Sequence, residues 1–216
     1  MKLYVGALSL FSAKARIALS EKGLQHELVH VGWSRQDRYL PHHPDVVAFN
    51  PKAQVPVLVD GDIVVYDSTL IFEYLEERFP EPALYPGDLE GRVRCRRLEA
   101  EADELWFPSV WDLIEQRFYA DGTGSEAREE AAHAALHVLY EGLEKDLVGR
   151  EFLAGDFGVA DIATFIQVHT AGILGVPVPE ACSGVTRWCQ RVLSRESVNP
   201  VLNEMQAAAA EAMRAA

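Results

Sequence analysis

The chain has 216 residues, of which 49% are apolar and 25% are charged, the composition of a globular protein that can bury a sizeable core. Its formal charge is −13, and the imbalance lies in residues 79–216, which carry 23 acidic against 12 basic side chains. An acidic surface repels phosphate backbones and anionic lipid, so nucleic acids and membrane surfaces are excluded as expected partners.

The cysteines and histidines give no sign of a disulfide framework or a metal centre. Cys95, Cys182 and Cys189 are too few and too scattered for either, and an odd number suits reduced thiols. His133 and His137 have the i, i+4 spacing of metal ligands, but no glutamate lies between them, so they indicate one face of an amphipathic helix. We therefore expect a cytoplasmic protein without a metal.

The first 31 residues alternate between strand and helix patterns. Residues 2–6 form a short apolar run, residues 13–23 have a helical pattern that stops at Gly23, and residues 26–31 resemble a second strand. Strand, helix and strand within about 30 residues form a crossover unit with parallel strands. The same start has features of a secretion signal, but its length of about 15 residues and a lysine inside the cleavage site favour a structural N-terminus.

The next segments complete one domain and begin another. Residues 55–66 ("VPVLVDGDIVVY") predict a hairpin, and residues 67–79 predict a helix that ends before a proline. We therefore expect an α/β domain over residues 1–79, with a mixed sheet of about four strands. The proline-rich stretch 80–87 is the predicted linker, and residues 88–216 are predicted to be all helical. The predicted helices of this second domain cover residues 89–119, 126–148, 159–174, 184–194 and 199–214.

Three places could carry chemistry. Ser9 lies where the first strand gives way to a helix, so its hydroxyl can either cap the helix or donate to a bound anion. Pro56 cannot donate to a strand ladder, which indicates either an edge start or a cis turn. Asp67 and Ser68 open a helix without a capping-box glutamate, so they indicate either plain capping or free N–H groups for an anion.

Three longer segments together resemble a known family. These are "SLFSAKARIALSEKGL" (9–24), "NPKAQVPVLVDGDIVVYDSTLIFEYLEERFP" (50–80) and "FLAGDFGVADI" (152–162). They resemble the cytosolic glutathione S-transferases of the serine type, which include theta, zeta and tau-like members. The resemblance implies a thioredoxin-like N-terminal domain, an all-helical C-terminal domain, a homodimer, and glutathione as co-substrate.

The resemblance assigns the two serines different roles. Ser9 matches the family's activating serine, which is a tyrosine or cysteine in other classes and stabilises the glutathione thiolate. Ser12 falls where redox-active relatives have a second cysteine, so disulfide exchange through an enzyme thiol is not implied. Ser12 is the alternative donor if removal of the Ser9 hydroxyl proves silent.

The remaining matched residues are expected to hold glutathione. Pro56 matches the family's cis-proline, and Val55 matches the residue whose backbone pairs with the cysteinyl part. Asp67 and Ser68 match the pair that holds the γ-glutamyl end, and Gln54 matches a frequent additional contact.

A small hydrophobic electrophile is expected to bind between the two domains. Its apolar wall is predicted from Phe11 together with Trp106, Phe107, Trp111 and Tyr119, although aromatic residues at helical spacing also suit a core. The resemblance implies a glutathione transferase. The alternatives are a non-catalytic protein-binding relative, or a glutathione-dependent isomerase, dehalogenase or ether-cleaving enzyme.

The chain departs from the family pattern in two places. The helix near residue 159 usually begins with serine or threonine as its cap, and here Gly158 occupies that position, with Asp161 able to reach back to its N–H. The sequence "SLF" replaces the "SSC" of zeta-class maleylacetoacetate isomerases, which lowers the expectation of an isomerase.

Overall fold

The computed structural model describes residues 1–119 and 124–214. At Met213 it describes the backbone and not the side chain. The chain divides into two compact units: unit 1 comprises Met1–Ala83 with Glu196–Ala216, and unit 2 comprises Leu84–Arg195. This grouping differs from the predicted division because the last helix, α9 (Asn199–Arg214), belongs to unit 1.

Polar contacts explain why α9 belongs to unit 1. The Arg16 guanidinium lies 2.6 Å from the Glu204 carboxylate, and the Ser197 hydroxyl donates to the Glu21 carboxylate. Both partners, Arg16 and Glu21, lie on α1 (Leu10–Glu21), the first helix of unit 1. The sequence pattern of a helical tail could not indicate these contacts, since their partners are more than 170 positions away.

The sheet of unit 1 has four strands in the order β2-β1-β3-β4. The strand β1 pairs in parallel with β2 and antiparallel with β3, and β3 pairs antiparallel with β4. The predicted crossover unit and hairpin are therefore confirmed. The strands are β1 (Lys2–Gly6), β2 (Glu27–Val31), β3 (Val57–Asp60) and β4 (Ile63–Tyr66).

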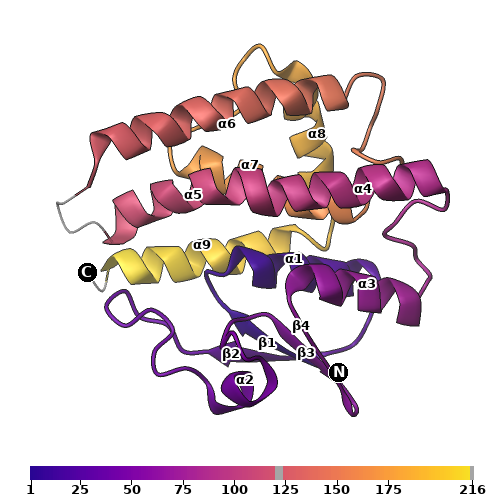
Figure 1. Ribbon diagram of the computed structural model, residues 1–216, viewed down its shortest axis with the longest axis vertical. Helices are drawn as coiled ribbons and strands as arrows, with labels where there is room; N and C mark the ends of the chain where they lie inside the picture. The colour runs from indigo at the N-terminus through magenta and orange to yellow at the C-terminus, as the bar shows by residue number, and fades with distance from the viewer. Residues whose placement is uncertain (120–123, 215–216) are drawn as a thin grey trace. The chain divides into compact units, whose positions relative to one another are not determined.

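Helices cover both faces of this sheet. In Figure 1, α1 and α3 (Ser68–Arg78) lie on one face and the short α2 (Pro44–Phe49) lies on the other. Successive side chains of β1 point to opposite faces of the sheet. Tyr4 packs with Val46 on the α2 side, and Leu3, which is fully buried, points to the other face. The thioredoxin-like arrangement predicted for the N-terminal domain is thus confirmed.

A buried lysine joins the ends of the two helices on the same face. The Lys22 ammonium, at the end of α1, lies 2.8 Å from the Glu76 carboxylate of α3. It also donates to the carbonyl oxygens of Phe79 and Pro82, at 2.7 and 2.9 Å. Because the charge is paired and its donors are used, burial is tolerated, and α3 is held in place at its C-terminal end.

Unit 2 is helical within its described residues, as predicted. Its first helix is continuous over residues 89–119, but two π-helical segments interrupt it. At the first, the Phe107 N–H donates to the Ala102 carbonyl, five residues back. Pro108 follows directly, and because proline lacks an N–H and crowds the carbonyl four residues back, a wider turn precedes it.

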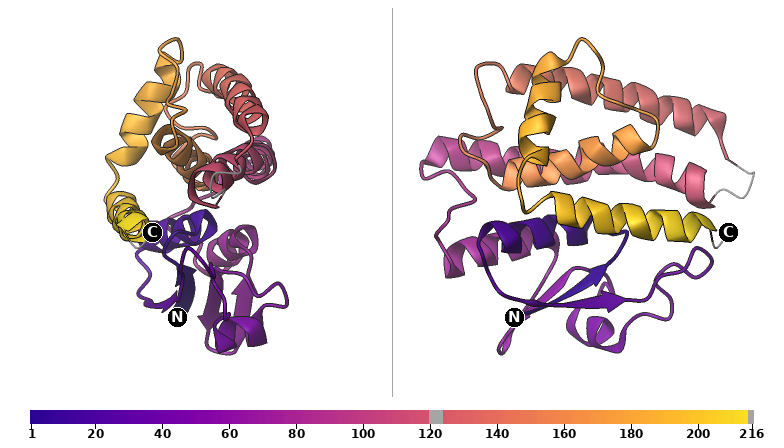
Figure 2. Two further views of the ribbon diagram at one scale, coloured as in Figure 1. Left: turned by 90° about the vertical axis from the view of Figure 1, so that its left-hand side faces the viewer. Right: turned by 180° about the vertical axis from the view of Figure 1, so that it is seen from behind.

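Figure 2 shows the helices of unit 2 from two further sides, with α6 alongside the interrupted helix. They are α4 (Leu89–Glu101), α5 (Phe107–Ile114), α6 (Glu126–Asp146), α7 (Val159–Ile173) and α8 (Ser183–Leu193). The π segments are η1 (Ala102–Trp106) and η2 (Glu115–Tyr119). Among the described residues, no helix has the length and apolar character required to cross a bilayer.

Candidate functional site

The turn between β1 and α1 carries Ser9, which is the N-cap of α1. Its hydroxyl oxygen accepts the Ser12 N–H at 3.1 Å, and its own N–H donates to the Gly6 carbonyl at 3.0 Å. A hydroxyl that accepts through a lone pair still has its proton to donate. Capping and donation to an anion are therefore compatible at Ser9, whereas the sequence presents them as alternatives.

Ser12 has a different environment from Ser9. It is 1% exposed, and its hydroxyl oxygen accepts the Gly6 N–H at 3.2 Å. Ser9, in contrast, is only half-buried, so a bound molecule can reach part of its surface. The structure thus gives Ser12 an internal role in closing the turn, and this favours Ser9 over Ser12 as a donor to a bound molecule.

The segment before β3 contains a cis peptide bond between Val55 and Pro56, which confirms the predicted cis turn. Asn50, at the end of α2, shapes the approach to it. Its side-chain N–H donates to the Gln54 carbonyl at 2.7 Å, and its side-chain oxygen accepts the Lys52 N–H at 2.9 Å. Sequence reasoning missed Asn50 as a site residue, although asparagine before proline at a helix end is a signal for such a turn.

The N-terminus of α3 combines a strained cap with a buried hydroxyl. Asp67 caps the helix by accepting the Thr69 N–H at 3.1 Å, and its φ of 77° lies in the left-handed region that non-glycine residues rarely adopt. Ser68 is 2% exposed, and its hydroxyl has no hydrogen-bond partner among the described residues. Buried polar groups are almost always paired, so an orphan hydroxyl at a helix N-terminus points to a ligand.

A lysine lies beside this helix start. The Lys52 ammonium is 3.3 Å from the Asp67 carboxylate, and both side chains are substantially exposed. An exposed pair of this kind contributes little to stability. Sequence reasoning missed Lys52 because its partner is 15 positions away, across the hairpin.

The aromatic residues predicted for the electrophile wall separate into two groups in unit 2. Trp106 is 4% exposed and packs edge-on against Tyr140, with 5.1 Å between ring centroids, which is a core environment. Phe107, Trp111 and Tyr119 instead form a strip along the helix. Their ring centroids are 5.9 Å apart at Phe107–Trp111 and 6.4 Å apart at Trp111–Tyr119.

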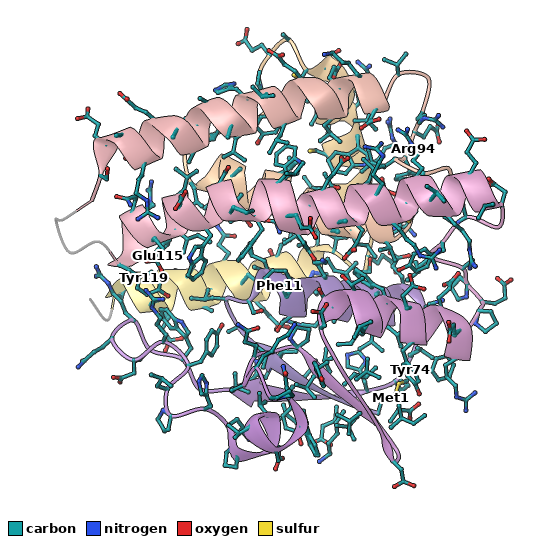
Figure 3. The ribbon with its side chains drawn as sticks, viewed as in Figure 1. Met1, Phe11, Tyr74, Arg94, Glu115 and Tyr119 are labelled. Atoms are coloured by element: carbon teal, nitrogen blue, oxygen red, sulfur yellow. The ribbon has the colours of Figure 1, made fainter. Side chains whose placement is uncertain are left out.

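In unit 1, Phe11 is half-buried on the first turn of α1. Figure 3 labels Phe11 on this helix. The Lys14 ammonium lies 5.5 Å from the centroid of the Phe11 ring, within cation–π range.

The chain's own thiols are unsuited to nucleophilic attack. Burial raises the pKa of Cys95 and of Cys189 to about 12, and it also raises the pKa of Cys182. At neutral pH all three are neutral thiols, and the thiolate is the reactive form. Over residues 1–119 and 124–214, no group of three or more His, Cys, Asp or Glu side chains could hold a metal ion.

Comparison with known proteins places two family models on this chain. The model described as "Glutathione S-transferase, N-terminal domain" matches residues 3–83, and "Glutathione S-transferase, C-terminal domain" matches residues 100–196. Together they span well over half of the sequence.

Individual relatives cover most of the chain. It is 32% identical to the Stringent starvation protein A homolog of Coxiella burnetii, over 95% of this chain and 93% of that protein. It is 31% identical to Glutathione S-transferase Z1 of Arabidopsis thaliana, over 79% of this chain and 77% of that one. Among solved structures, a glutathione S-transferase from Rhodospirillum rubrum F11 superposes with a TM-score of 0.82 at 31% identity, covering 93% of this chain and 91% of that one.

Proposed function

Because the chain belongs to the glutathione S-transferase family, we propose that it binds glutathione as co-substrate and activates its thiol for attack on a small hydrophobic electrophile. One observation carries the proposal: Ser9 caps α1 through a lone pair and keeps its proton for a second hydrogen bond. The cis bond before Pro56 and the orphan hydroxyl of Ser68 support the same assignment.

Glutathione is an extended molecule, and the site residues divide its parts among them. The backbone of Val55, beside the cis bond, pairs with the cysteinyl part, and Gln54 adds a contact. The γ-glutamyl carboxylate accepts from the Ser68 hydroxyl and from N–H groups at the start of α3, and its ammonium lies against Asp67. These contacts fix the thiol near Ser9.

The reaction begins with loss of the thiol proton to solvent. A free thiol has a pKa of about 8.5, so only a few per cent is thiolate at neutral pH. The Ser9 hydroxyl donates to the thiolate, and the N-terminus of α1 adds a partial positive charge. Each unit by which the pKa falls requires about 1.4 kcal/mol, within the range of one charge-assisted bond and the helix dipole.

The thiolate then forms a carbon–sulfur bond to the electrophile. In a substitution, the bond to the leaving group breaks and that group departs with its electron pair. We place the electrophile beside Phe11, on the same turn as Ser9. Within unit 2, the strip of Phe107, Trp111 and Tyr119 remains a candidate apolar surface, and we leave Trp106 out because it is buried in the core of that unit. The protein contributes by positioning and by stabilising the thiolate.

The test is a titration of bound glutathione, in which thiolate absorbance is followed against pH. We expect Ser9→Ala to raise the titration midpoint by about one unit, since it removes one hydrogen bond to a charged group. Ser12→Ala is the matched comparison, because its hydroxyl is 1% exposed and touches the site only through the Gly6 N–H. It should move the midpoint less than Ser9→Ala does. An unchanged midpoint in Ser9→Ala would defeat the role of Ser9, and a shift in Ser12→Ala alone would transfer that role to Ser12.

A second candidate is a non-catalytic member of the family that binds protein partners. The comparisons leave it open, since a relative that covers nearly the whole chain is named Stringent starvation protein A homolog and not glutathione S-transferase. Retention on immobilised glutathione, followed by a panel of chloro-aromatic, epoxide, aryl-ether and maleyl substrates, separates the candidates. Turnover of any one supports the enzyme and identifies transfer, dehalogenation, ether cleavage or isomerisation. Binding without turnover supports the non-catalytic alternative.

We further propose that the protein is a cytoplasmic homodimer. Apolar side chains are exposed on α3 (Leu70, 54%) and on α4 (Leu89, 78%, and Val93, 58%), and association would remove them from water. Sedimentation equilibrium of the wild type and of Leu89→Glu with Val93→Glu tests the proposal. A monomeric wild type would refute it, and an unaltered dimer in the double variant would show that Leu89 and Val93 lie outside the interface.

A further inference from the structure

We infer that Tyr39 is a positioning residue for Ser9, acting through Gly6; this inference rests on the proposed function. Tyr39 lies in the segment between β2 and α2, far in sequence from the first turn, and nothing in the motifs above includes it. Its ring lies against Gly6 on the side where any other residue would carry its Cβ.

Gly6 is held from three directions. Its carbonyl accepts the Ser9 N–H at 3.0 Å, and its N–H donates to the Ser12 hydroxyl at 3.2 Å. On the side where a Cβ would lie, the Tyr39 hydroxyl overlaps the Cβ position, and the ring carbons Cε1 and Cζ come within 2.7 Å of it. Real Cβ atoms essentially never approach so closely, so only glycine allows Tyr39 to occupy this place.

The segment that presents Tyr39 is itself structured. Ser34 and Arg38 exchange two backbone hydrogen bonds of 2.8 Å, and the Leu40 N–H donates to the Asp37 carbonyl at 3.0 Å. These bonds close a tight loop directly before and after Tyr39. These hydrogen bonds therefore fix the backbone on both sides of Tyr39, and with it the position of the ring against Gly6.

Tyr39 also belongs to the apolar cluster on the α2 side of the sheet. The cluster is built on Tyr4, Val31, Val46 and Val57, and it includes Val55 as well as Tyr39. Tyr4 and Val57 are the last residues at which β1 pairs with β3, so Gly6 and Val55 both lie beyond that pairing at this end of the sheet. Tyr39 thus packs at the end of the sheet where both the Ser9 turn and the cis bond lie.

The consequence is a steric brace for the thiol donor. A short turn with a glycine is intrinsically mobile, and two hydrogen bonds alone leave one face of Gly6 open. With the Tyr39 ring against that face, the Gly6 carbonyl is fixed, and so is the Ser9 N–H bonded to it. Ser9 then keeps the orientation in which its hydroxyl can donate to the thiolate, which matters because small misplacements of a donor weaken it strongly.

The test is the titration of bound glutathione in Tyr39→Ala. We expect the midpoint to rise by at least half a pH unit. At a pH well below the midpoint, this rise lowers the fraction of bound glutathione that is thiolate about threefold. The kcat should fall, while the KM for glutathione should stay nearly unchanged. Tyr39→Phe keeps the ring and should restore the wild-type midpoint. If Tyr39→Ala fails to fold, Tyr39→Leu replaces it, with a smaller rise expected.

Tyr74→Ala is the matched control for loss of a half-buried tyrosine. The Tyr74 hydroxyl donates to the Asp60 carboxylate at 2.7 Å, and Asp60 lies at the opposite end of the sheet from Gly6. Lys2 pairs with Val59, next to Asp60, and Figure 3 labels Tyr74 and Met1, the residue before β1. This variant should lower the melting temperature without moving the thiol midpoint.

A double-mutant cycle isolates the contact with Gly6. Gly6→Ala should raise the thiol midpoint in the wild type, because its methyl group displaces the ring, and should have little further effect in Tyr39→Ala, where space has been made. Additive shifts would overturn the inference, and so would an unchanged midpoint in Tyr39→Ala that still binds glutathione. Failure of the proposed function is distinguishable, since the wild type itself would then bind no glutathione or show no lowered midpoint.

Discussion

Two helix N-termini in this protein differ in how far their polar groups are hydrogen-bonded by the protein itself. At α7, in unit 2, the protein satisfies its own donors: the Gly158 N–H donates to the Asp161 carboxylate at 3.1 Å, and the Val159 N–H donates to the Leu84 carbonyl at 3.0 Å. At α3, in unit 1, the cap Asp67 has a left-handed backbone, and the buried Ser68 hydroxyl has no partner within the described chain.

The difference shows which helix start serves stability and which serves binding. Asp161 is completely buried and also accepts the Leu153 N–H at 3.0 Å and the Trp188 indole N–H at 2.7 Å, so it ties α7 to a loop and to α8. A saturated site of this kind has no capacity left for a ligand. The start of α3 keeps an unsatisfied group and a strained residue, a combination that is found at functional sites.

The largest effect is expected from Asp161→Ala. The substitution leaves three buried N–H donors without an acceptor, each of which costs about 1–3 kcal/mol. We expect a loss of about 3 kcal/mol or more in the free energy of unfolding, measured by urea denaturation at pH 7. A loss below 1 kcal/mol would show that the start of α7 is not the closed site described above.

Asp161 also makes stability depend on pH in an unusual direction. Burial raises its pKa to about 6, against the lowering effect of its N–H donors, while the value in the unfolded chain is near 3.8. A raised carboxyl pKa means that the folded state binds the proton more tightly, so this contribution to stability is complete below about pH 4 and is lost as pH rises through 6. The loss is on the order of 3 kcal/mol.

The measurement compares wild type with Asp161→Asn across this window, since the other titrating groups are common to both. The wild type should lose stability relative to the variant between pH 4 and pH 7. If instead the wild type gains on the variant as pH rises, the N–H donors outweigh burial and the carboxylate form is the favoured one.

A smaller loss, of about 1–3 kcal/mol, is expected from Gly158→Ser, although it restores the family's usual cap. A Cβ at this position would overlap the Leu84 carbonyl oxygen, so the backbone must shift. Gly172→Ala, near the other end of α7, is the control, because a Cβ there meets nothing within 4 Å. It should stabilise the helix by about 0.5–1 kcal/mol. If Gly158→Ser stabilised the protein, the Leu84 carbonyl oxygen would not lie close enough to residue 158 to exclude a Cβ.

The sequence predicts the parts of this comparison that depend on local pattern. The four strands, the hairpin and the reach of Asp161 to the Gly158 N–H are all confirmed. At Pro56 the local pattern allowed either an edge start or a cis turn, and the cis bond is the one that the family resemblance implies. The Asp161 contact with Trp188 and the carbonyl of Leu84 over Gly158 could not be predicted, because they join segments that only the folded core brings together. For the same reason glycine at position 158 appeared as a weakened cap, whereas the structure requires it.

The candidate site follows the same rule. Ser9, Asp67 and Ser68 were identifiable because helix starts have local signals, but their hydrogen-bonding states were not. Whether Ser9 keeps its proton, and whether Ser68 has a partner, depends on atoms placed by the turn and by the hairpin.

The smallest effect on stability is expected from Ser68→Ala, and it distinguishes the two helix starts most directly. An unpartnered buried hydroxyl is costly, so its removal should leave the free energy of unfolding equal to that of the wild type or raise it by up to about 1 kcal/mol. Glutathione affinity should nevertheless fall about tenfold or more, since one hydrogen bond to a charged group is lost. Ser197→Ala is the matched control: it is also buried, but its hydroxyl donates to Glu21, so it should lose stability and keep its affinity. A clear loss of stability in Ser68→Ala without loss of affinity would mean that α3, like α7, is closed by the protein itself.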